Sequence, residues 1–324
     1  MTRWTGTITK GPDVPLHGMP ALSPLVATAR LCAGEPVVRH LTMKGADGVT
    51  WALVGTRDGR AGWIDDARVL TDAVFIIDLY WKDLGGKPDW SIAAAAPGVA
   101  GAMLKATQGL SYPSKARAWF RKNWTALAQV CLERNGVSWF RAAYHYLEFN
   151  QSGAAQFDYH YKVVQSAGGY APMDLPVVVD VERPEGSVNR KASRQQVVAC
   201  VESFAERCHV VTGTWPILYA GSAMRDLGIK GLMRCSGLWT ADYGETIDVA
   251  QLQKLGVTVK DLVFWQHVGD GRGKATQTLS GRTLYRQIPG FGACDLSVLT
   301  FGAGRIDDML DLSGWVHTLD GRVA

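Results

Sequence analysis

The sequence predicts two parts, an α/β barrel of eight strands over residues 71–324 and a small all-β domain over residues 1–70. A chain of 324 residues is long for one small domain, since a domain averages about 150 residues. From Ala73 onward, short apolar runs alternate with helical patterns, which is typical of βα units and a parallel sheet. Before Ala73, short strand-like runs and scattered prolines leave no room for a long helix.

The small domain begins with two strand-like segments in residues 27–43, separated by Gly34, and continues with a hairpin. Residues 49–64 contain two strand-like runs joined at Asp58-Gly59, a favoured tight-turn dipeptide. Trp51 and the Gly62-Trp63-Ile64 strand make this part similar to a bacterial SH3 domain. That resemblance implies a module that binds cell-wall peptide or glycan. Alternatively, Trp51 and Trp63 only fill a small barrel, because small β domains need aromatic core residues whatever they bind.

Eight apolar runs follow in the second part, and eight strands fit a closed barrel. They span residues 74–79, 101–107, 141–147, 176–182, 215–220, 237–243, 262–268 and 292–298. One intervening helix is marked clearly, because Ser193 and Gln196 form a capping box and Gly213 stops the pattern. Apolar side chains recur at helical spacing between them, including Cys200 and Cys208.

Composition narrows the class of protein further. With 47% hydrophobic and 20% charged residues, a net charge of +4 and a pI near 8.7, the chain is predicted to be soluble and globular and not a nucleic-acid binder. Its six cysteines lack CxxC pairs and metal-ligand spacing, which indicates reduced thiols. No apolar run reaches eighteen residues and the start lacks a signal-like segment. We therefore expect no membrane span and a cytoplasmic location until another device releases the protein.

Polar and aromatic residues gather where the predicted strands end, which is the rim where a barrel collects its active site. Asp180 and Glu182, at i and i+2 on a valine-rich strand, point to the same face, about 7 Å apart along the strand. The other rim residues are Asp78, Lys105 to Gly109, Tyr144, His145, Tyr146, Asp242, Tyr243, Trp265, Gln266, His267 and Asp295.

Paired carboxylates beside aromatic rings suit the cleavage of a glycosidic bond. One carboxyl group donates a proton to the leaving oxygen, while ionised neighbours stabilise positive charge at the anomeric carbon. Crowded like charges would raise the pKa of Glu182 toward neutrality.

The predicted strands carry seven motifs, which are, in order, "IIDLYW", "MLKATQG", "AAYHYLEF", "PVVVDVE", "LWTADY", "FWQHV" and "CDLSVL". From Val74 to near Phe301, these motifs resemble those of glycoside hydrolase family 25, the Chalaropsis-type lysozymes. The resemblance implies a flattened TIM-type barrel that cuts bacterial peptidoglycan at the β-1,4 bond after N-acetylmuramic acid, without a cofactor or metal. It makes Glu182 the general acid and Asp180 its acidic neighbour, with Asp78 and Asp295 as the other two active-site aspartates. If the sugar's N-acetyl group participates, Asp180 would orient that amide with help from Tyr144; direct attack by water is the alternative.

The remaining candidates are assigned to substrate binding. They are Tyr144, Lys105, Tyr80, Trp81, Trp239, Asp242, Tyr243, Trp265 and Gln266. Tyr80 takes the place of a histidine that is usual after the family's first aspartate. The segment 270–290 carries Arg272, Lys274, Arg282 and Arg286, which either bind an anionic wall polymer or are a solvated basic insertion.

Several alternatives stay open from the sequence. Asp180 and Glu182 could form a structural ion pair with Arg183 or Arg190, and Lys105 could be a Schiff-base lysine rather than an ion-pair partner. His145 and His267 are expected to line the cleft, and Trp81, Trp239 and Trp265 either stack on sugars or fill the core. The competing functions are a chitinase-like glycosidase and an inactive glycan-binding barrel. The expected setting is that of a phage endolysin released through a holin-type pore, or of a lysozyme on a phage-like particle.

Overall fold

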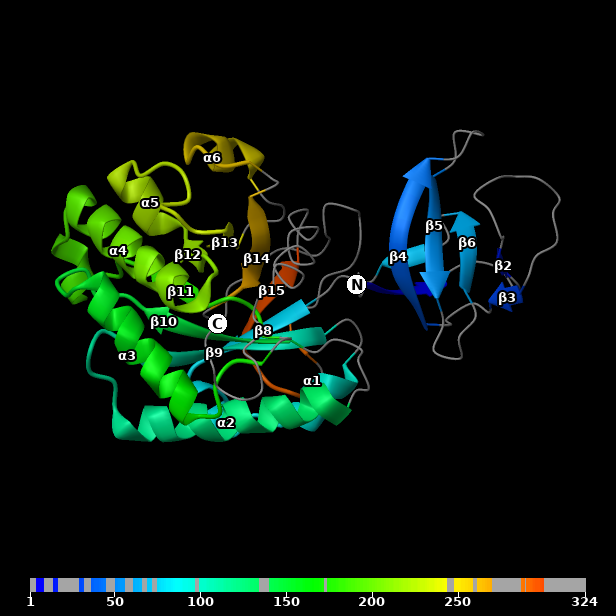
Figure 1. Cartoon of the computed structure of the whole chain (residues 1–324), viewed down its shortest axis with the longest axis horizontal. Coiled ribbons are helices and arrows are strands. Elements are labelled where there is room, and N and C mark those ends of the chain that lie inside the picture. The colour runs from blue at the N-terminus through cyan, green and yellow to red at the C-terminus, as the bar shows by residue number, and fades with distance from the viewer. Residues whose placement is uncertain are drawn as a thin grey trace. The chain divides into compact units, whose positions relative to one another are not determined.

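The structure is a computed structural model of the whole chain, and it divides into two compact units, Met1–Asp72 and Ala73–Ala324. It describes residues 4–8, 14–16, 29–31, 36–44, 50–55, 61–65, 69–71, 75–96, 99–133, 140–171, 174–243, 248–258, 261–269, 287–288 and 290–299. Figure 1 shows both units.

The first unit consists of strands in its described part. The strands are β1 (Trp4–Ile8), β2 (Val14–Leu16), β3 (Ala29–Leu31), β4 (Pro36–Lys44), β5 (Thr50–Gly55), β6 (Ala61–Asp65) and β7 (Val69–Thr71). Five of them form an antiparallel sheet in the order β6-β5-β4-β1-β7, and β2 pairs with β3. The predicted hairpin is confirmed, because β5 and β6 pair from Trp51↔Asp65 to Gly55↔Ala61. Trp51 and Ile64 are buried, so at least Trp51 fills the core of this unit.

The second unit is a closed barrel with the strand order β10-β11-β12-β13-β14-β15-β8-β9, as predicted. Its strands are β8 (Phe75–Leu79), β9 (Val99–Gln108), β10 (Phe140–Tyr146), β11 (Val178–Val181), β12 (Ile217–Ala220), β13 (Gly237–Ala241), β14 (Leu262–Val268) and β15 (Asp295–Leu299). Helices lie outside the strands (Figure 1). They are α1 (Trp90–Ala95), α2 (Ser114–Glu133), α3 (Gly153–Ser166), α4 (Arg194–Thr212), α5 (Ser222–Leu227) and α6 (Val249–Lys254), with 3-10 turns η2 (Asp83–Gly86) and η3 (Val188–Lys191).

The prediction of a parallel sheet is wrong for the last strand, since β15 runs antiparallel to both β14 and β8. An antiparallel neighbour needs no crossover, so the chain can leave β14 and enter β15 at the same end of the barrel. This reversal places Asp295, the first residue of β15, directly opposite Asp78 near the end of β8.

The core has two layers because side chains alternate along each strand. One layer fills the barrel interior and the other lies between strands and helices. The interior layer contains Ile76, Met103, Phe140, Ala142, Tyr144, Leu175, Val178, Ile217, Trp239, Val263 and Phe264, with Tyr219 packed against them.

Helix α4 forms as the sequence predicts. The Ser193–Gln196 capping box is present, Cys200 and Cys208 are buried free thiols, and Gly213 ends the helix at φ 74°. No helix within the described ranges is long and apolar enough to cross a membrane.

Candidate active site

Three predicted acidic residues sit on strands that meet at the rim formed by the carboxyl ends of β8 to β14. Asp78 follows the interior-facing Ile76 by two residues, and Asp180 follows Val178 in the same way. Asp295 reaches the rim from the start of β15. Glu182 comes one residue after β11 ends, and its charge acts on Asp180, Lys105 and Asp78.

Burial dominates the electrostatics of this rim. It raises the pKa of Asp180 well above its ordinary value, and the nearby charges of Glu182 and Asp78 raise it further, while Lys105 lowers it. Burial is also the largest cause that raises the pKa of Asp78, followed by the charges of Asp295 and Asp83. Low solvation is therefore the largest cause for both aspartates, and the crowded charges add to it.

One oxygen of each of these two carboxyl groups is buried without a hydrogen-bond partner. These oxygens are Oδ1 of Asp78 and Oδ1 of Asp180. The Asp180 residue is only 5% exposed. An unsatisfied buried acceptor costs about 1–3 kcal/mol. Such a cost is expected where a side chain is kept for function.

Lys105 brings the counter-charge. Its side chain points into the barrel mouth, and its Nζ lies 4.3 Å from the ring centroid of Tyr146 and 5.9 Å from that of Tyr112. Burial lowers the pKa of Lys105, and the charges of Asp180, Glu182, Asp78 and Glu148 oppose that shift without overcoming it. The acidic cluster therefore favours the charged form of Lys105, but it does not raise the pKa of Lys105 above the ordinary value.

A tyrosine and a glutamine connect the far side of the mouth to Asp295. The Tyr219 hydroxyl donates to Gln266 Oε1 at 2.7 Å, and Gln266 Nε2 donates to Asp295 Oδ2 at 2.8 Å. Tyr144 hydrogen-bonds the Asp78 carboxyl group on the opposite side. Each of Asp78 and Asp295 is thus held by a neutral donor.

Three residues of the mouth were missed in the sequence. Tyr219 is the penultimate residue of the predicted strand 215–220, so the rule that found Asp78 could have found it. Asp83 and Tyr112 lie in segments after their strands, where strand phase gives no guidance. The Tyr112 hydroxyl is buried without a hydrogen-bond partner.

Two predicted sugar platforms are core residues instead. Trp239 and Trp265 are each 1% exposed, and their indole N–H groups donate to Ser297 Oγ and to the Asp242 carbonyl. Trp265 also belongs to the helix-side layer, because its position in β14 points outward. Of the two open alternatives, packing is correct for both residues.

The other predicted binding residues lie closer to solvent. Tyr80 is 37% exposed, and Trp81 is half-buried with Lys115 Nζ 4.5 Å from its ring centroid. Asp242 and Tyr243 follow β13 at the rim, and the Tyr243 hydroxyl approaches Gly269 so closely that a β-carbon there would clash with it.

The expectation that His145 and His267 line the cleft is wrong. Both are fully buried, His145 stacks on Phe204 of α4, and His267 contacts the rings of Phe75 and Trp265 in the helix-side layer. Strand alternation places a residue next to an inward one on the outer face.

His145 belongs to a chain of hydrogen bonds between β9, β10 and α3. Gln156 fixes its direction, because Nε2 donates to the Glu148 carbonyl and Oε1 must then accept from His145 Nε2–H. Thr107 Oγ1 consequently donates to His145 Nδ1 and accepts from His160 Nδ1–H, and His160 Nε2 accepts from Tyr170. Burial lowers the pKa of His145 to about 3, so the chain contains neutral rings.

Further alternatives from the sequence are resolved around the rim. Arg183 and Arg190 pair with Asp226 and Glu185, so neither forms an ion pair with Asp180. Gly109 has φ +47°, and a β-carbon there would lie 2.5 Å from Glu148 Oε2, which confirms its backbone role. Arg272, Lys274, Arg282 and Arg286 lie outside the described residues. Within the described ranges, no group of three or more His, Cys, Asp or Glu side chains could hold a metal ion.

A barrel whose mouth brings several carboxyl groups together beside aromatic rings defines the class of barrel glycoside hydrolases. Comparison with protein families agrees, because the model described as "Glycosyl hydrolases family 25" matches residues 77–275. The chain therefore belongs to glycoside hydrolase family 25.

Known proteins show the same relationship. The chain is 31% identical over 122 residues to an N,O-diacetylmuramidase from Chalaropsis sp, and the match covers 36% of this chain. It spans about half of that curated relative, 53% of its length. A family GH25 lysozyme from Aspergillus fumigatus has a similar fold, with a TM-score of 0.54 and 18% identity over 74% of this chain and 99% of that one. A bacterial lysozyme from Streptomyces coelicolor also has a similar fold, with a TM-score of 0.52 and 24% identity. That match covers 75% of this chain and 97% of the Streptomyces chain.

Proposed function

We propose that this protein is a peptidoglycan hydrolase, an N-acetylmuramidase that cleaves the β-1,4 bond between N-acetylmuramic acid and N-acetylglucosamine. The observation that carries the proposal is the convergence of Asp78, Asp180 and Asp295 at one rim of a family 25 barrel, with Glu182 two residues beyond Asp180. The muramidase name of a relative with 31% identity supports the substrate. Family membership also sets aside the chitinase-like alternative.

Glu182 fits the general acid because it is the outer member of the pair. It is half-buried, whereas Asp180 is buried deeper on the strand, so Glu182 is better placed to reach a glycosidic oxygen entering the mouth. The charge of Glu182 raises the pKa of Asp180, and like charges act on each other reciprocally. The Asp180–Glu182 pair therefore loses its second proton less readily than its first, so one proton is retained to a higher pH.

Asp180 fits a role in orienting the substrate. Its carboxyl group lies at the rim two residues before Glu182 and is suited to accept the N–H of the sugar's N-acetyl group. Asp78 and Asp295 fit the stabilisation of positive charge at the anomeric carbon, since Tyr144 and Gln266 hold their carboxyl groups in place.

The direct test replaces Glu182 by Gln and measures the clearing of peptidoglycan suspensions. Removing the general acid should lower the rate at least ~100-fold. Glu185→Gln is the matched control, because Glu185 lies three residues away, is exposed and pairs with Arg190. An undiminished rate for Glu182→Gln would exclude the assignment.

Residues 1–70 as a wall-binding module, the cytoplasmic location before release, and delivery by a pore or particle stay predictions.

A further inference from the structure

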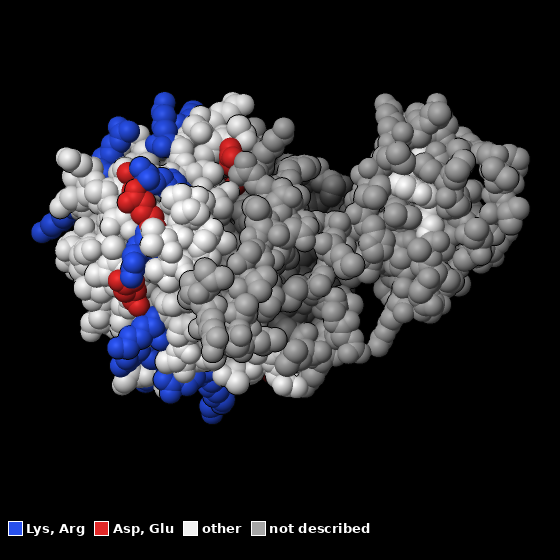
Figure 2. Space-filling view, in the orientation of Figure 1, with Lys and Arg blue, Asp and Glu red and all other residues white. Residues whose placement is uncertain are grey.

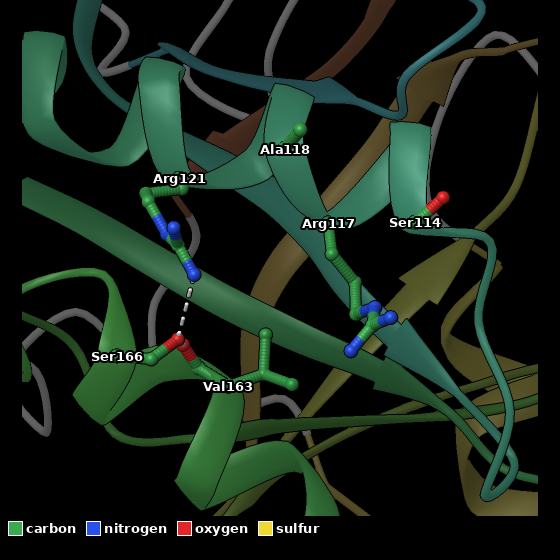
Figure 3. Close-up of a pocket in the computed structure, with 6 residues that line it drawn as sticks. All are labelled: Ser114, Arg117, Ala118, Arg121, Val163 and Ser166. Carbon is green, nitrogen blue, oxygen red and sulfur yellow. Dashed lines mark hydrogen bonds between the residues drawn. The ribbon is translucent and has the colours of Figure 1, made fainter.

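A cavity on the outside of the barrel, between α2 and α3, belongs to no part of the active site. Its volume is about 230 Å³, and it is lined by Ser114, Arg117, Ala118, Arg121, Val163 and Ser166. Figure 3 shows both arginines extending from α2 toward α3, with Val163 and Ser166 on the opposite side. Pockets for drug-sized ligands usually hold about 300–1,000 Å³, so this cavity suits a single small group.

The donors of the cavity match an anion. Arg117 and Arg121 are one helical turn apart, so their side chains lie on the same face of α2. Arg121 Nη2 lies 3.5 Å from Ser166 Oγ, and Ser114 adds a second hydroxyl at the other end. Guanidinium groups bind phosphate oxygens through paired N–H donors, and the Ser114 hydroxyl can donate to the same group. The Ser166 hydroxyl donates to the Val163 carbonyl at 2.7 Å, so its oxygen accepts from Arg121 and positions that guanidinium.

The surrounding charge favours the same ligand. Residues 114–125 contain Lys115, Arg117, Arg121 and Lys122 and no acidic residue. On α3, Asp158 is engaged by Arg207 Nε at 2.7 Å. Figure 2 shows basic side chains along the lower edge of the barrel unit, where Figure 1 places α2. No ion pair among the described residues neutralises Arg117 or Arg121.

The position of the cavity connects it to the substrate. Five residues separate the end of β9 at the active-site rim from the start of α2, so the first turns of α2, which line the cavity, lie on the rim side of the barrel. A helix rises about 1.5 Å per residue, which places Arg117 and Arg121 within about 11 Å of the helix start. Both arginines therefore lie near the end of α2 that faces the rim, where a polymer attached to a bound glycan strand would emerge.

We propose that Ser114, Arg117, Arg121 and Ser166 form a secondary site for the phosphodiester groups of an anionic polymer linked to the peptidoglycan substrate. The site would hold phosphate-bearing walls beside the active site without taking part in cleavage. The inference rests on the proposed peptidoglycan hydrolase function.

The test compares two substrates, wall fragments that carry phosphodiester polymers and the same fragments after hydrofluoric acid has removed them. The variant is Arg117→Gln with Arg121→Gln. The control is Lys230→Gln with Lys254→Gln, which removes the same charge from exposed positions on other elements. The cleavage rate at limiting substrate and co-sedimentation with the fragments are measured for each protein.

We expect the arginine variant to lose about tenfold on phosphate-bearing walls, the size of one charge-assisted interaction, and to equal the unsubstituted protein on stripped walls. The lysine control should stay within about twofold of the unsubstituted protein on both substrates. An equal loss on both substrates, no loss, or the same loss in the control would overturn the proposal. So would binding to phosphatidylglycerol vesicles with none to the polymer. If the unsubstituted protein fails to cleave stripped walls, the proposed function itself has failed.

Discussion

At the scale of single residues, the acidic rim is a place where function and stability conflict. Asp78 carries a partnerless buried oxygen, and burial together with three neighbouring carboxyl groups raises its pKa. A carboxyl group whose pKa is raised on folding stabilises the protein fully below its unfolded pKa. It loses that contribution as pH rises through the folded pKa. The raised pKa of Asp78 should therefore make the fold less stable near neutral pH than it is in acid.

Asp78→Asn tests this cost. An amide can still accept from Tyr144 but cannot ionise, so Tm should rise by a few degrees at pH 7. Replacing a residue that destabilises an active site commonly raises stability in this way. The gain should shrink as pH falls and disappear below the ordinary pKa of 3.8, where the carboxyl group of the unsubstituted protein is neutral in both the folded and the unfolded state. Thermal unfolding across this pH range measures the effect, with exposed Asp158→Asn as the control. A lower Tm for Asp78→Asn at pH 7 would show that the ionised form supports the fold.

Some residues of the site could be predicted from the sequence and others could not. Asp78, Asp180 and Glu182 were predictable because strand phase and strand ends are visible in the chain. Trp239 and Trp265 were ambiguous, because an aromatic ring at a strand end fits both a sugar platform and a packed core. His145 follows the inward Tyr144, and His267 is three residues from the inward Phe264, so alternation along each strand places both histidines on the outer face.

At the scale of elements, α3 is attached to β9 and β10 by the chain that runs from Tyr170 through His160, Thr107 and His145 to Gln156. Thr107 is central because one hydroxyl group both donates and accepts. Thr107 lies in the "KATQG" motif, whose Lys105 faces the mouth of the barrel. One motif therefore provides a side chain to the mouth and another to the layer between strands and helices. The sequence predicts these strands and the helix. It does not predict the hydrogen bonds between them, because those depend on distances in the folded protein and not on the spacing of residues along the chain.

Thr107→Val keeps the shape of the side chain and removes the hydroxyl. Two buried imidazole nitrogens would lose their partner, so unfolding free energy should fall by about 2–4 kcal/mol. Denaturant unfolding measures the loss. Thr107→Ser, which keeps the hydroxyl, should lose only about 1 kcal/mol for the missing methyl group, and Thr125→Val on the exposed face of α2 is a further control. Equal stability of Thr107→Val and Thr107→Ser would contradict the role of the hydrogen-bond chain.

At the scale of the whole molecule, eight strand-like runs were enough to predict the closed barrel and its order. The direction of β15 was not predictable, because apolar alternation is the same in parallel and antiparallel strands. The antiparallel direction is what brings Asp295 opposite Asp78.

The first unit, Met1–Asp72, whose described residues form strands, is predicted to bind the wall while the barrel cleaves it. Removing residues 1–70 should weaken co-sedimentation with purified walls and spare cleavage of small soluble muropeptides, since the barrel carries the acidic rim. Residues 1–70 expressed alone should bind the same walls. Unchanged sedimentation of the shortened protein would contradict a targeting role for this unit.

Mass spectrometry of the products from defined muropeptides identifies the bond that the rim cleaves. We expect products with reducing N-acetylmuramic acid ends from the unsubstituted protein and from Glu185→Gln, and at least ~100-fold less of them from Glu182→Gln in the same time. Products with reducing N-acetylglucosamine ends, or an equal yield from Glu182→Gln, would overturn the proposed function.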